Sequence, residues 1–285
     1  MSGRWTFLND GFVPEREACL HYKDLALQRG YGAFDFFRVK NQHPLFPDAH
    51  LERFLQSAKQ LHLEPGAGIP RLKELIAELI KKNGITDGGI RLTLTGGYST
   101  DGFKPGKPNL LISQQDFLPP SPTETEVGIS LITHPHQRQL PEVKSIDYLM
   151  AIWLQPIIQA KKAQDVLYHN NGWLRECPRS NFFIVDAQGV LATPAIEVLK
   201  GITRKRIISM AENMLEVSER EIHLDELHQC REAFICSTTK GVLPVRVIDG
   251  IELGGNFPVA RNLSKLLKEA EKSAVEPTGT FRNHG

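Results

Sequence analysis

The sequence predicts a soluble α+β protein built from two domains. Its 285 residues exceed the roughly 100 to 200 residues that one domain usually holds. Hydrophobic residues make up 41% of the chain, so a sizeable core can be buried. Helical and strand patterns occur on both sides of a proline-rich segment. We expect an N-terminal α/β domain over residues 1–116, a linker over 117–126, a C-terminal domain over 127–273 and a loose tail over 274–285.

The N-terminal elements follow from apolar spacing and from residues that end helices. Residues 48–63 place apolar side chains on one helical face. A second amphipathic helix covers residues 70–83 and ends at Gly84, which tolerates the left-handed conformation of a helix end. Residues 90–94 alternate as a strand does, and residues 109–113 form a short apolar run. These patterns predict an α/β unit.

The linker and the C-terminal elements are expected from similar patterns. Residues 117–125 read FLPPSPTET, and their prolines cannot continue a helix or a central strand. Residues 147–164 predict a helix kinked at Pro156, and residues 203–215 predict an amphipathic helix. Strands are expected over residues 127–133, 181–185, 232–237 and 242–248.

Composition and spacing exclude several classes of function. A net charge of +1 and a pI of about 7.7 do not provide the basic surface of a nucleic-acid-binding protein. The chain starts without a signal-peptide pattern, and no stretch approaches the roughly 18 apolar residues of a membrane span. The cysteines and histidines show no metal-ligand spacing. We expect a cytoplasmic protein without a metal, nucleic-acid or membrane partner.

Two segments could bind an anion. Gly201, Ile202 and Thr203 come directly before the predicted amphipathic helix, where backbone N–H groups attract negative charge. The competing interpretation is that Thr203 only caps that helix. Residues 237–241, STTKG, gather hydroxyls and amides at a strand end. With Arg53 on the first helix, the two segments would form a phosphate pocket.

Three further candidates are weaker when taken one at a time. Arg29 lies beside glycines that would let a ligand approach the backbone, although a simple turn before a strand explains the same pattern. Glu176 precedes a strand, where a solvated loop carboxylate is the commoner case. No physical rule selects Lys144 among the lysines, because the burial that activates an amine is not visible in a sequence.

Six stretches become specific when they are taken together and in order. They are residues 29–38 (RGYGAFDFFR), 50–54 (HLERF), 144–149 (KSIDYL), 176–183 (ECPRSNFF), 199–204 (LKGITR) and 237–244 (STTKGVLP). The set resembles the class IV, or fold-type IV, pyridoxal-phosphate-dependent aminotransferase family. This resemblance implies a smaller N-terminal α/β sandwich domain and a larger C-terminal pseudo-barrel domain that binds pyridoxal 5′-phosphate. It also implies a homodimer whose active sites are each completed by a loop of the partner subunit.

The resemblance assigns a role to each matching residue. Lys144 is implied to be catalytic and to carry the cofactor as a Schiff base, while Glu176 keeps the pyridine nitrogen protonated. Tyr148 matches a tyrosine near the cofactor hydroxyl, and Leu199 matches an aliphatic residue packed on the ring. The residues implied to surround the phosphate are Arg53, Gly201, Ile202, Thr203, Thr238 and Thr239.

The substrate depends on the cations that bind its carboxylate, because arginine matches that group with two hydrogen bonds. Common D-amino-acid transaminases carry an arginine where this chain reads TGGY at residues 95–98. Arg29 and Arg91 resemble the pair of a two-arginine subgroup of D-amino-acid transaminases, which favours D-amino acids such as D-alanine or D-glutamate as donors to a 2-oxo acid.

Three alternatives stay open. A branched-chain L-amino-acid aminotransferase is the second hypothesis, because those enzymes also have arginines at the positions of Arg38 and Arg91. An aminodeoxychorismate lyase is the third, although the Ser-Arg-Gly stretch of many such lyases is missing. A cofactor carrier without turnover would usually have lost Lys144 or Glu176, and this chain keeps both.

Overall fold

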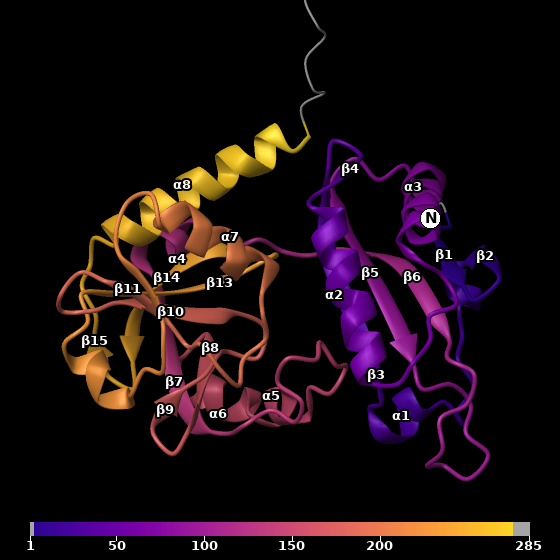
Figure 1. The fold of residues 1–285 in the computed structure, drawn as a ribbon, viewed down its shortest axis with the longest axis horizontal. Coiled ribbons are helices and arrows are strands. Elements are labelled where there is room, and N and C mark those ends of the chain that lie inside the picture. The colour runs from indigo at the N-terminus through magenta and orange to yellow at the C-terminus, as the bar shows by residue number, and fades with distance from the viewer. Residues whose placement is uncertain (1–2, 276–285) are drawn as a thin grey trace, which may run out of the picture.

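The computed structural model describes residues 3–275 and places two sheets side by side (Figure 1). The first sheet is formed by residues before Asp116 and the second by residues after Gly128. The expected two-domain α+β arrangement is confirmed, and the limits at residues 116 and 126 stay our proposal. No helix among residues 3–275 is long and apolar enough to cross a membrane.

The N-terminal sheet has six antiparallel strands in the order β2-β1-β6-β5-β3-β4. The strands are β1 (Trp5–Leu8), β2 (Gly11–Pro14), β3 (Gly32–Lys40), β4 (His43–Pro44), β5 (Gly88–Thr95) and β6 (Leu110–Gln115). The helices of this half are the short α1 (Leu25–Arg29), then α2 (Pro47–Gln60) and α3 (Ile69–Asn83), with one 3-10 turn, η1 (Glu15–Glu17). Helices α2 and α3 pack on the sheet and bury their apolar sides in a common core.

Local chemistry explains where these helices begin and end. A proline lies in the first turn of both α2 and α3, where its missing N–H costs nothing. Gly84 ends α3 with a left-handed φ of 61°, as its residue type predicts. The expected apolar stripe of α3 is confirmed, because all five of its residues are buried: Leu72, Leu75, Ile76, Leu79 and Ile80.

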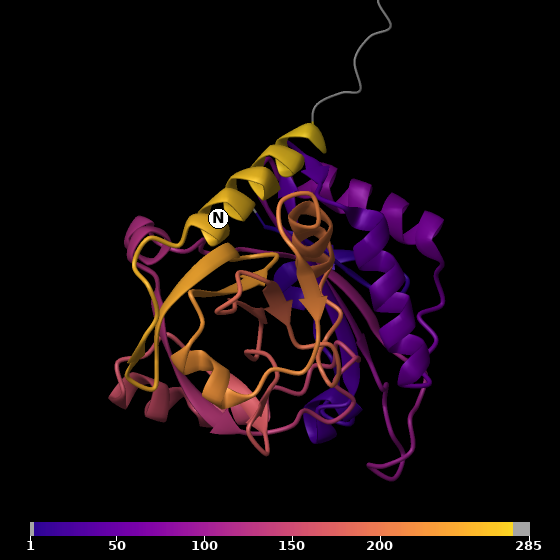
Figure 2. The same ribbon diagram turned by 60° about the vertical axis from the view of Figure 1, so that its left-hand side comes forward.

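The C-terminal sheet has nine strands and curls into a half-barrel (Figure 2). Along the sheet the order is β12-β11-β10-β13-β14-β7-β8-β9, and β15 pairs with β14. The strands are β7 (Ile129–Pro135), β8 (Asp165–Asn170), β9 (Trp173–Leu174), β10 (Asn181–Val185), β11 (Leu191–Thr193), β12 (Val217–Glu219), β13 (Glu232–Ser237), β14 (Gly241–Ile248) and β15 (Ile251–Glu252). The helices are α4 (Pro122–Val127), α5 (Leu149–Trp153), α6 (Gln155–Ala160), α7 (Ile202–Ala211) and α8 (Pro258–Ser273), with the 3-10 turn η2 (Leu224–His228).

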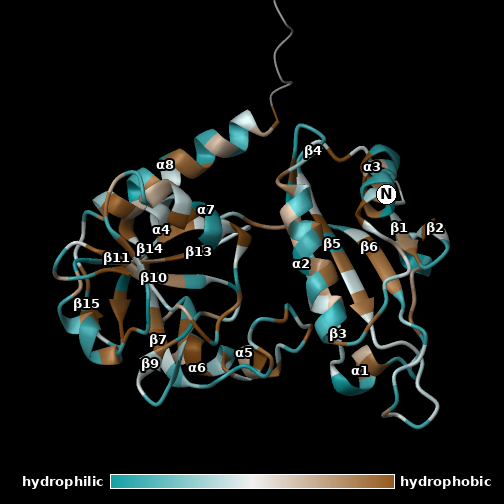
Figure 3. Cartoon of the chain, viewed as in Figure 1, coloured by the Kyte–Doolittle hydropathy of each residue, from teal (hydrophilic) through white to brown (hydrophobic). Residues whose placement is uncertain are grey.

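Strand β10 shows why the central strands are apolar throughout. Phe182 and Ile184 point into the curl, while Phe183 and Val185 pack against α7 and α8 on the outer face. A strand buried on both faces carries a continuous apolar run instead of alternation. Figure 3 shows the hydrophobic colour along these strands, and both colours along α8, as expected of a helix with one buried side.

Several predicted elements differ from the observed ones. Pro156 does not kink one helix over residues 147–164: it lies in the first turn of α6, which is separate from α5. The helix expected over residues 203–215 is α7, which begins one residue earlier and ends at Ala211. Half of the expected linker is helical, because Ser121 and Glu124 form a capping box at the start of α4. Most of the expected tail, residues 276–285, lies outside the described residues.

A short segment of the C-terminal half pairs with strand β3 of the N-terminal sheet. The Phe34 N–H donates to the Lys144 carbonyl at 2.9 Å, and the Ile146 N–H donates to the Gly32 carbonyl at 3.0 Å. The Lys144 N–H donates to Oγ of Ser57 on α2 at 3.1 Å. Three hydrogen bonds therefore fix residues 144–146 at the seam between the two domains.

Candidate active site

Lys144 lies in that seam, with Nζ 4.7 Å from the ring centroid of Phe34. Burial lowers the pKa of its ammonium from 10.5 to about 7, and the positive charges of Arg53 and Arg138 act in the same direction. An amine with a pKa near 7 is partly uncharged at neutral pH and can act as a nucleophile or a base. Lys144 is therefore chemically distinct from an ordinary surface lysine.

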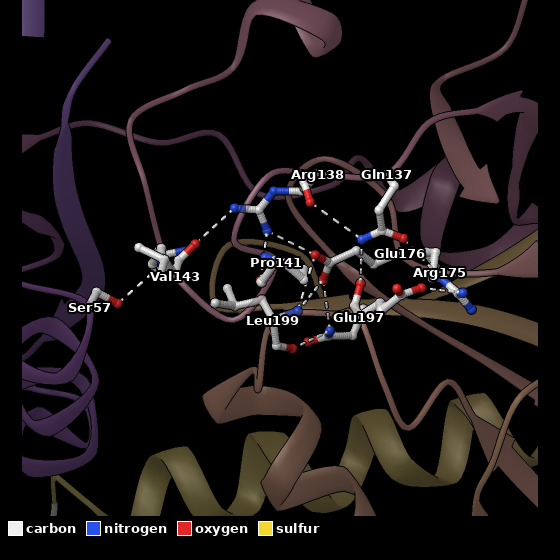
Figure 4. A network of polar contacts seen from close by, with 11 residues as sticks. Ser57, Gln137, Arg138, Pro141, Val143, Arg175, Glu176, Glu197 and Leu199 are labelled. Atoms are coloured by element: carbon white, nitrogen blue, oxygen red, sulfur yellow. Dashed lines mark hydrogen bonds and ion pairs between the residues drawn. The ribbon is translucent and has the colours of Figure 1, made fainter. Parts of the chain in front are cut away.

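Glu176 lies in a network of hydrogen-bond donors and is only 4% exposed (Figure 4). Arg138 Nη1 donates to Oε1 at 2.9 Å, Asn181 Nδ2 donates to Oε2 at 3.1 Å, and the Leu199 N–H lies 3.2 Å from both oxygens. Burial raises the pKa of Glu176, while Arg138 and these hydrogen bonds oppose that rise. The alternative expectation, that Glu176 is a solvated loop carboxylate, is therefore wrong.

Arg138 connects this carboxylate to the segment that carries Lys144. Its guanidinium donates to the carbonyls of Val143 at 3.0 Å and Pro141 at 3.4 Å, in addition to Glu176. Asn181 makes a similar connection on the other side, because its Nδ2 also donates to the Leu199 carbonyl at 2.8 Å. The sequence did not indicate a role for either residue. Arg138 is 38 positions from Glu176, and no local pattern specifies the contact between Asn181 and Glu176.

The N-terminus of α7 is open to an anion. Gly201 occupies the N-cap position and has no side chain to cap the helix, while Thr203 is the second helical residue. The interpretation that Thr203 caps the helix is therefore wrong. A Cβ on Gly201 would lie 2.0 Å from Oδ1 of Asn181, so the close approach of the two segments requires glycine.

Arg53, on α2, is held by a buried carboxylate and does not line the pocket formed by Thr203 and Thr238. Asp35 accepts hydrogen bonds of 2.8 Å from Nε and Nη2 of Arg53 and contacts Nδ1 of His50 at 2.8 Å. Burial alone would raise the pKa of Asp35, but Arg53 and His50 hold it well below its usual range. Nη1 of Arg53 is not used by these bonds.

The two predicted anion segments meet at one small pocket. Thr203 of α7 and Thr238 of the β13–β14 turn both line it, together with Ile202 and, from the N-terminal domain, His50. The turn is ordered locally, because the hydroxyls of Ser237 and Thr239 lie 3.4 Å apart. Segments distant in sequence thus line the same pocket.

Tyr148 and Arg91 also lie beside the ring of Phe34. The Tyr148 ring centroid is 5.9 Å from that of Phe34, and burial raises the pKa of the phenol. The Arg91 guanidinium stacks 4.0 Å from the Phe34 ring centroid, and its Nε donates to Oγ1 of Thr93 at 3.3 Å. Burial lowers the pKa of Arg91. Arg91 and Lys144 therefore both contact the ring of Phe34.

Within one chain, the side-chain hydrogen bond of Arg29 does not join it to the residues around Lys144. It ends α1, is exposed, and donates to the carbonyl of Gln28 at 2.9 Å. Within the described residues, the charges that act on Lys144 and Tyr148 do not include Arg29. Exposed apolar side chains occur just before α1, on α1 and in the loop after β5, namely Tyr22, Leu27, Tyr98 and Phe103.

A sequence profile described as "Amino-transferase class IV" matches residues 32–248. The chain belongs to the class IV aminotransferases. Members of this family are enzymes that use pyridoxal 5′-phosphate. This class IV aminotransferase is 32% identical over 280 residues to a "putative branched-chain-amino-acid aminotransferase" of Methanocaldococcus jannaschii, covering 93% of this chain and 94% of that protein. It is 28% identical to the "D-alanine aminotransferase" of Bacillus licheniformis, covering 95% and 99% of the two chains.

Solved structures confirm the fold. The branched-chain amino acid aminotransferase of Escherichia coli superposes with a TM-score of 0.88 at 24% identity, covering 97% of both chains. A branched-chain aminotransferase of Thermoproteus uzoniensis superposes with a TM-score of 0.86 at 25% identity, covering 96% of this chain and 97% of the other. The predicted fold-type IV architecture, with its pseudo-barrel C-terminal domain, is confirmed.

Proposed function

We propose that this aminotransferase binds pyridoxal 5′-phosphate through Lys144 and exchanges the amino group between a D-amino acid and a 2-oxo acid. The buried amine of Lys144, with its pKa lowered to about 7, carries the catalytic part of this proposal. It lies in the seam near the Glu176 network, and the α7 N-terminus approaches that network through Asn181. The residue set therefore matches a cofactor with an aldehyde, a basic ring nitrogen and a phosphate.

The donor set fits the phosphate in particular. Gly201 leaves the first amides of α7 for an external acceptor, and Thr203 and Thr238 line the adjoining pocket. In our proposal Arg53 adds a charge through Nη1, while Thr239 adds a hydroxyl. Leu199 would pack on the ring, and Tyr148 would bind the ring hydroxyl.

Once bound, the cofactor draws negative charge from the substrate Cα into its ring. Glu176 would support this by accepting a hydrogen bond from the protonated ring nitrogen, which keeps the proton on that nitrogen, and Arg138 and Asn181 hold the carboxylate in one orientation. Lys144 Nζ first holds the cofactor and then takes the proton from the substrate Cα. A base works best when its pKa is close to the working pH, as it is here.

The choice of a D-amino acid rests on Arg91 and Arg29. In our proposal Arg91 binds the substrate carboxylate above Phe34, close to Lys144. Arg29 is exposed beside apolar side chains, so we propose a homodimer in which it enters the site of the second copy. A mixed dimer tests this: a Lys144→Ala chain with a normal Arg29 should restore activity to an Arg29→Ala partner only if Arg29 acts across the interface.

The substrate is tested by single turnovers with the purified holoenzyme. We expect the visible absorption band of the lysine-bound cofactor to bleach with D-alanine or D-glutamate. Bleaching by L-leucine alone would instead support the branched-chain alternative, which the similarity to the Methanocaldococcus jannaschii protein favours. Consumption of aminodeoxychorismate alone would support the lyase. Lys144→Ala should lose both the band and turnover, and turnover at the wild-type rate would refute the catalytic assignment.

A further inference from the structure

A part-buried ion pair anchors the turn between β13 and β14 and has no part in the chemistry described so far. Nζ of Lys240 is 2.6 Å from Oδ2 of Asp165, and the two side chains are 17% and 9% exposed. Asp165 begins strand β8, and its Oδ1 accepts the N–H of Val166 at 2.9 Å. Lys240 comes from the turn between β13 and β14. The pair therefore ties that turn to a strand with which it shares no backbone hydrogen bond.

The tied turn is the one that carries the hydroxyls of Thr238 and Thr239. Lys240 follows them directly, and its N–H donates to Oγ of Ser237 at 3.2 Å. Gly241 closes the turn with a φ of 62°. The Lys240 side chain thus anchors the turn to β8, in addition to these contacts within the turn.

A buried ion pair is an expensive way to gain stability, because desolvation offsets much of the attraction between the charges. Such a pair is better explained by the geometry that it fixes. The surroundings agree, because Cys177, next to Glu176, lies within the field of both charges. The pair thus links the turn to β8, and the Tyr168 N–H of β8 donates to the Glu176 carbonyl at 3.0 Å.

We propose that Lys240 is a positioning residue whose ion pair with Asp165 fixes Thr238 and Thr239 in the geometry that binds the cofactor phosphate. This inference rests on the proposed cofactor site and deepens it. It concerns binding of the phosphate and not the chemistry at Lys144. Loss of the pair should therefore weaken ligands that carry the phosphate and spare those that lack it.

The test compares pyridoxal 5′-phosphate with pyridoxal, which has no phosphate, on full-length protein freed of cofactor. Binding is followed by the absorption band of the lysine-bound aldehyde. Lys240→Gln is too short to reach Asp165 and should weaken pyridoxal 5′-phosphate by about tenfold or more, with pyridoxal within about threefold. Lys240→Arg keeps charge and reach, and it should bind both like the wild type.

Two further variants separate positioning from general stability. Arg220→Gln breaks a part-buried ion pair with Asp186 and Glu226 elsewhere in the same domain, and it should leave both affinities unchanged. If Lys240→Gln does not fold, the double variant with Asp165→Asn removes the lone buried charge and should show the same selective loss.

Equal losses for both ligands, or unchanged binding of pyridoxal 5′-phosphate by Lys240→Gln, would overturn the positioning role. The same selective loss in Arg220→Gln would overturn it too. Failure of the wild-type protein itself to bind pyridoxal 5′-phosphate would instead overturn the proposed function.

Discussion

Replacing Lys144 with methionine should make the cofactor-free protein more stable at neutral pH, although it removes the amine that we propose to be catalytic. The folded state lowers the pKa of this lysine from 10.5 to about 7. Each unit of difference between the unfolded and the folded pKa corresponds to about 1.4 kcal/mol of stability. The buried amine therefore lowers the free energy of unfolding by up to about 4 to 5 kcal/mol at pH 7. Methionine has a similar volume and no charge to desolvate.

The pH dependence gives this prediction its sign. The folded protein releases the proton near pH 7, while the unfolded chain keeps it until about pH 10.5, so unfolding takes up a proton between these values. The destabilisation by Lys144 is therefore complete at and below pH 7 and disappears as the pH approaches 10.5. The gain from Lys144→Met should follow the same course.

Urea unfolding of the cofactor-free proteins at pH 7 and pH 10 measures this gain. We expect Lys144→Met to raise the free energy of unfolding by about 2 kcal/mol or more at pH 7, and by much less at pH 10. Lys59→Met, at an exposed position of α2, is the matched control and should change little at either pH. A variant no more stable than the wild type at pH 7, or a gain that persists at pH 10, would refute the reasoning.

Three further substitutions test the surroundings of Lys144. Gly201→Ala should lower the melting temperature and weaken binding of pyridoxal 5′-phosphate, because the new Cβ would clash with Oδ1 of Asn181; normal binding would show that the segments can separate. Asp35→Asn should cost about 3 kcal/mol of unfolding free energy at pH 7, because it leaves Arg53 without its buried counterion, and the cost should shrink as the pH falls below 3.8, where the carboxyl of the unfolded wild-type chain takes up a proton and that of the folded protein does not. Arg91→Ala should raise the KM for the amino acid about tenfold or more in steady-state assays, and a matching loss of cofactor affinity would contradict a carboxylate contact.

The sequence predicted best what local patterns encode. Helices α2 and α3 matched closely because apolar spacing, prolines and Gly84 all mark them. Helix α8 was not predicted, although Ala260, Leu263 and Leu267 lie on one side of it and are buried.

The site could be predicted only where a motif matched. Motifs identified Lys144 and Glu176, but neither burial nor a perturbed pKa follows from the sequence around them. Arg138 and Asp35 escaped notice because their roles depend on partners that the fold brings together. Arg138 reaches Glu176 across 38 positions of the chain. Such contacts have no local signature.

Residues 144–146 pair with strand β3, so the environment of the Lys144 amine depends on the contact between the two domains. The key amine comes from one domain, but the other domain provides Phe34 and Ser57, against which it packs. A hinge motion that parted the domains would return water to Lys144 and restore its ordinary basicity. An opened enzyme would then hold a protonated, unreactive lysine, so the reactive amine exists only while the site is shut against solvent.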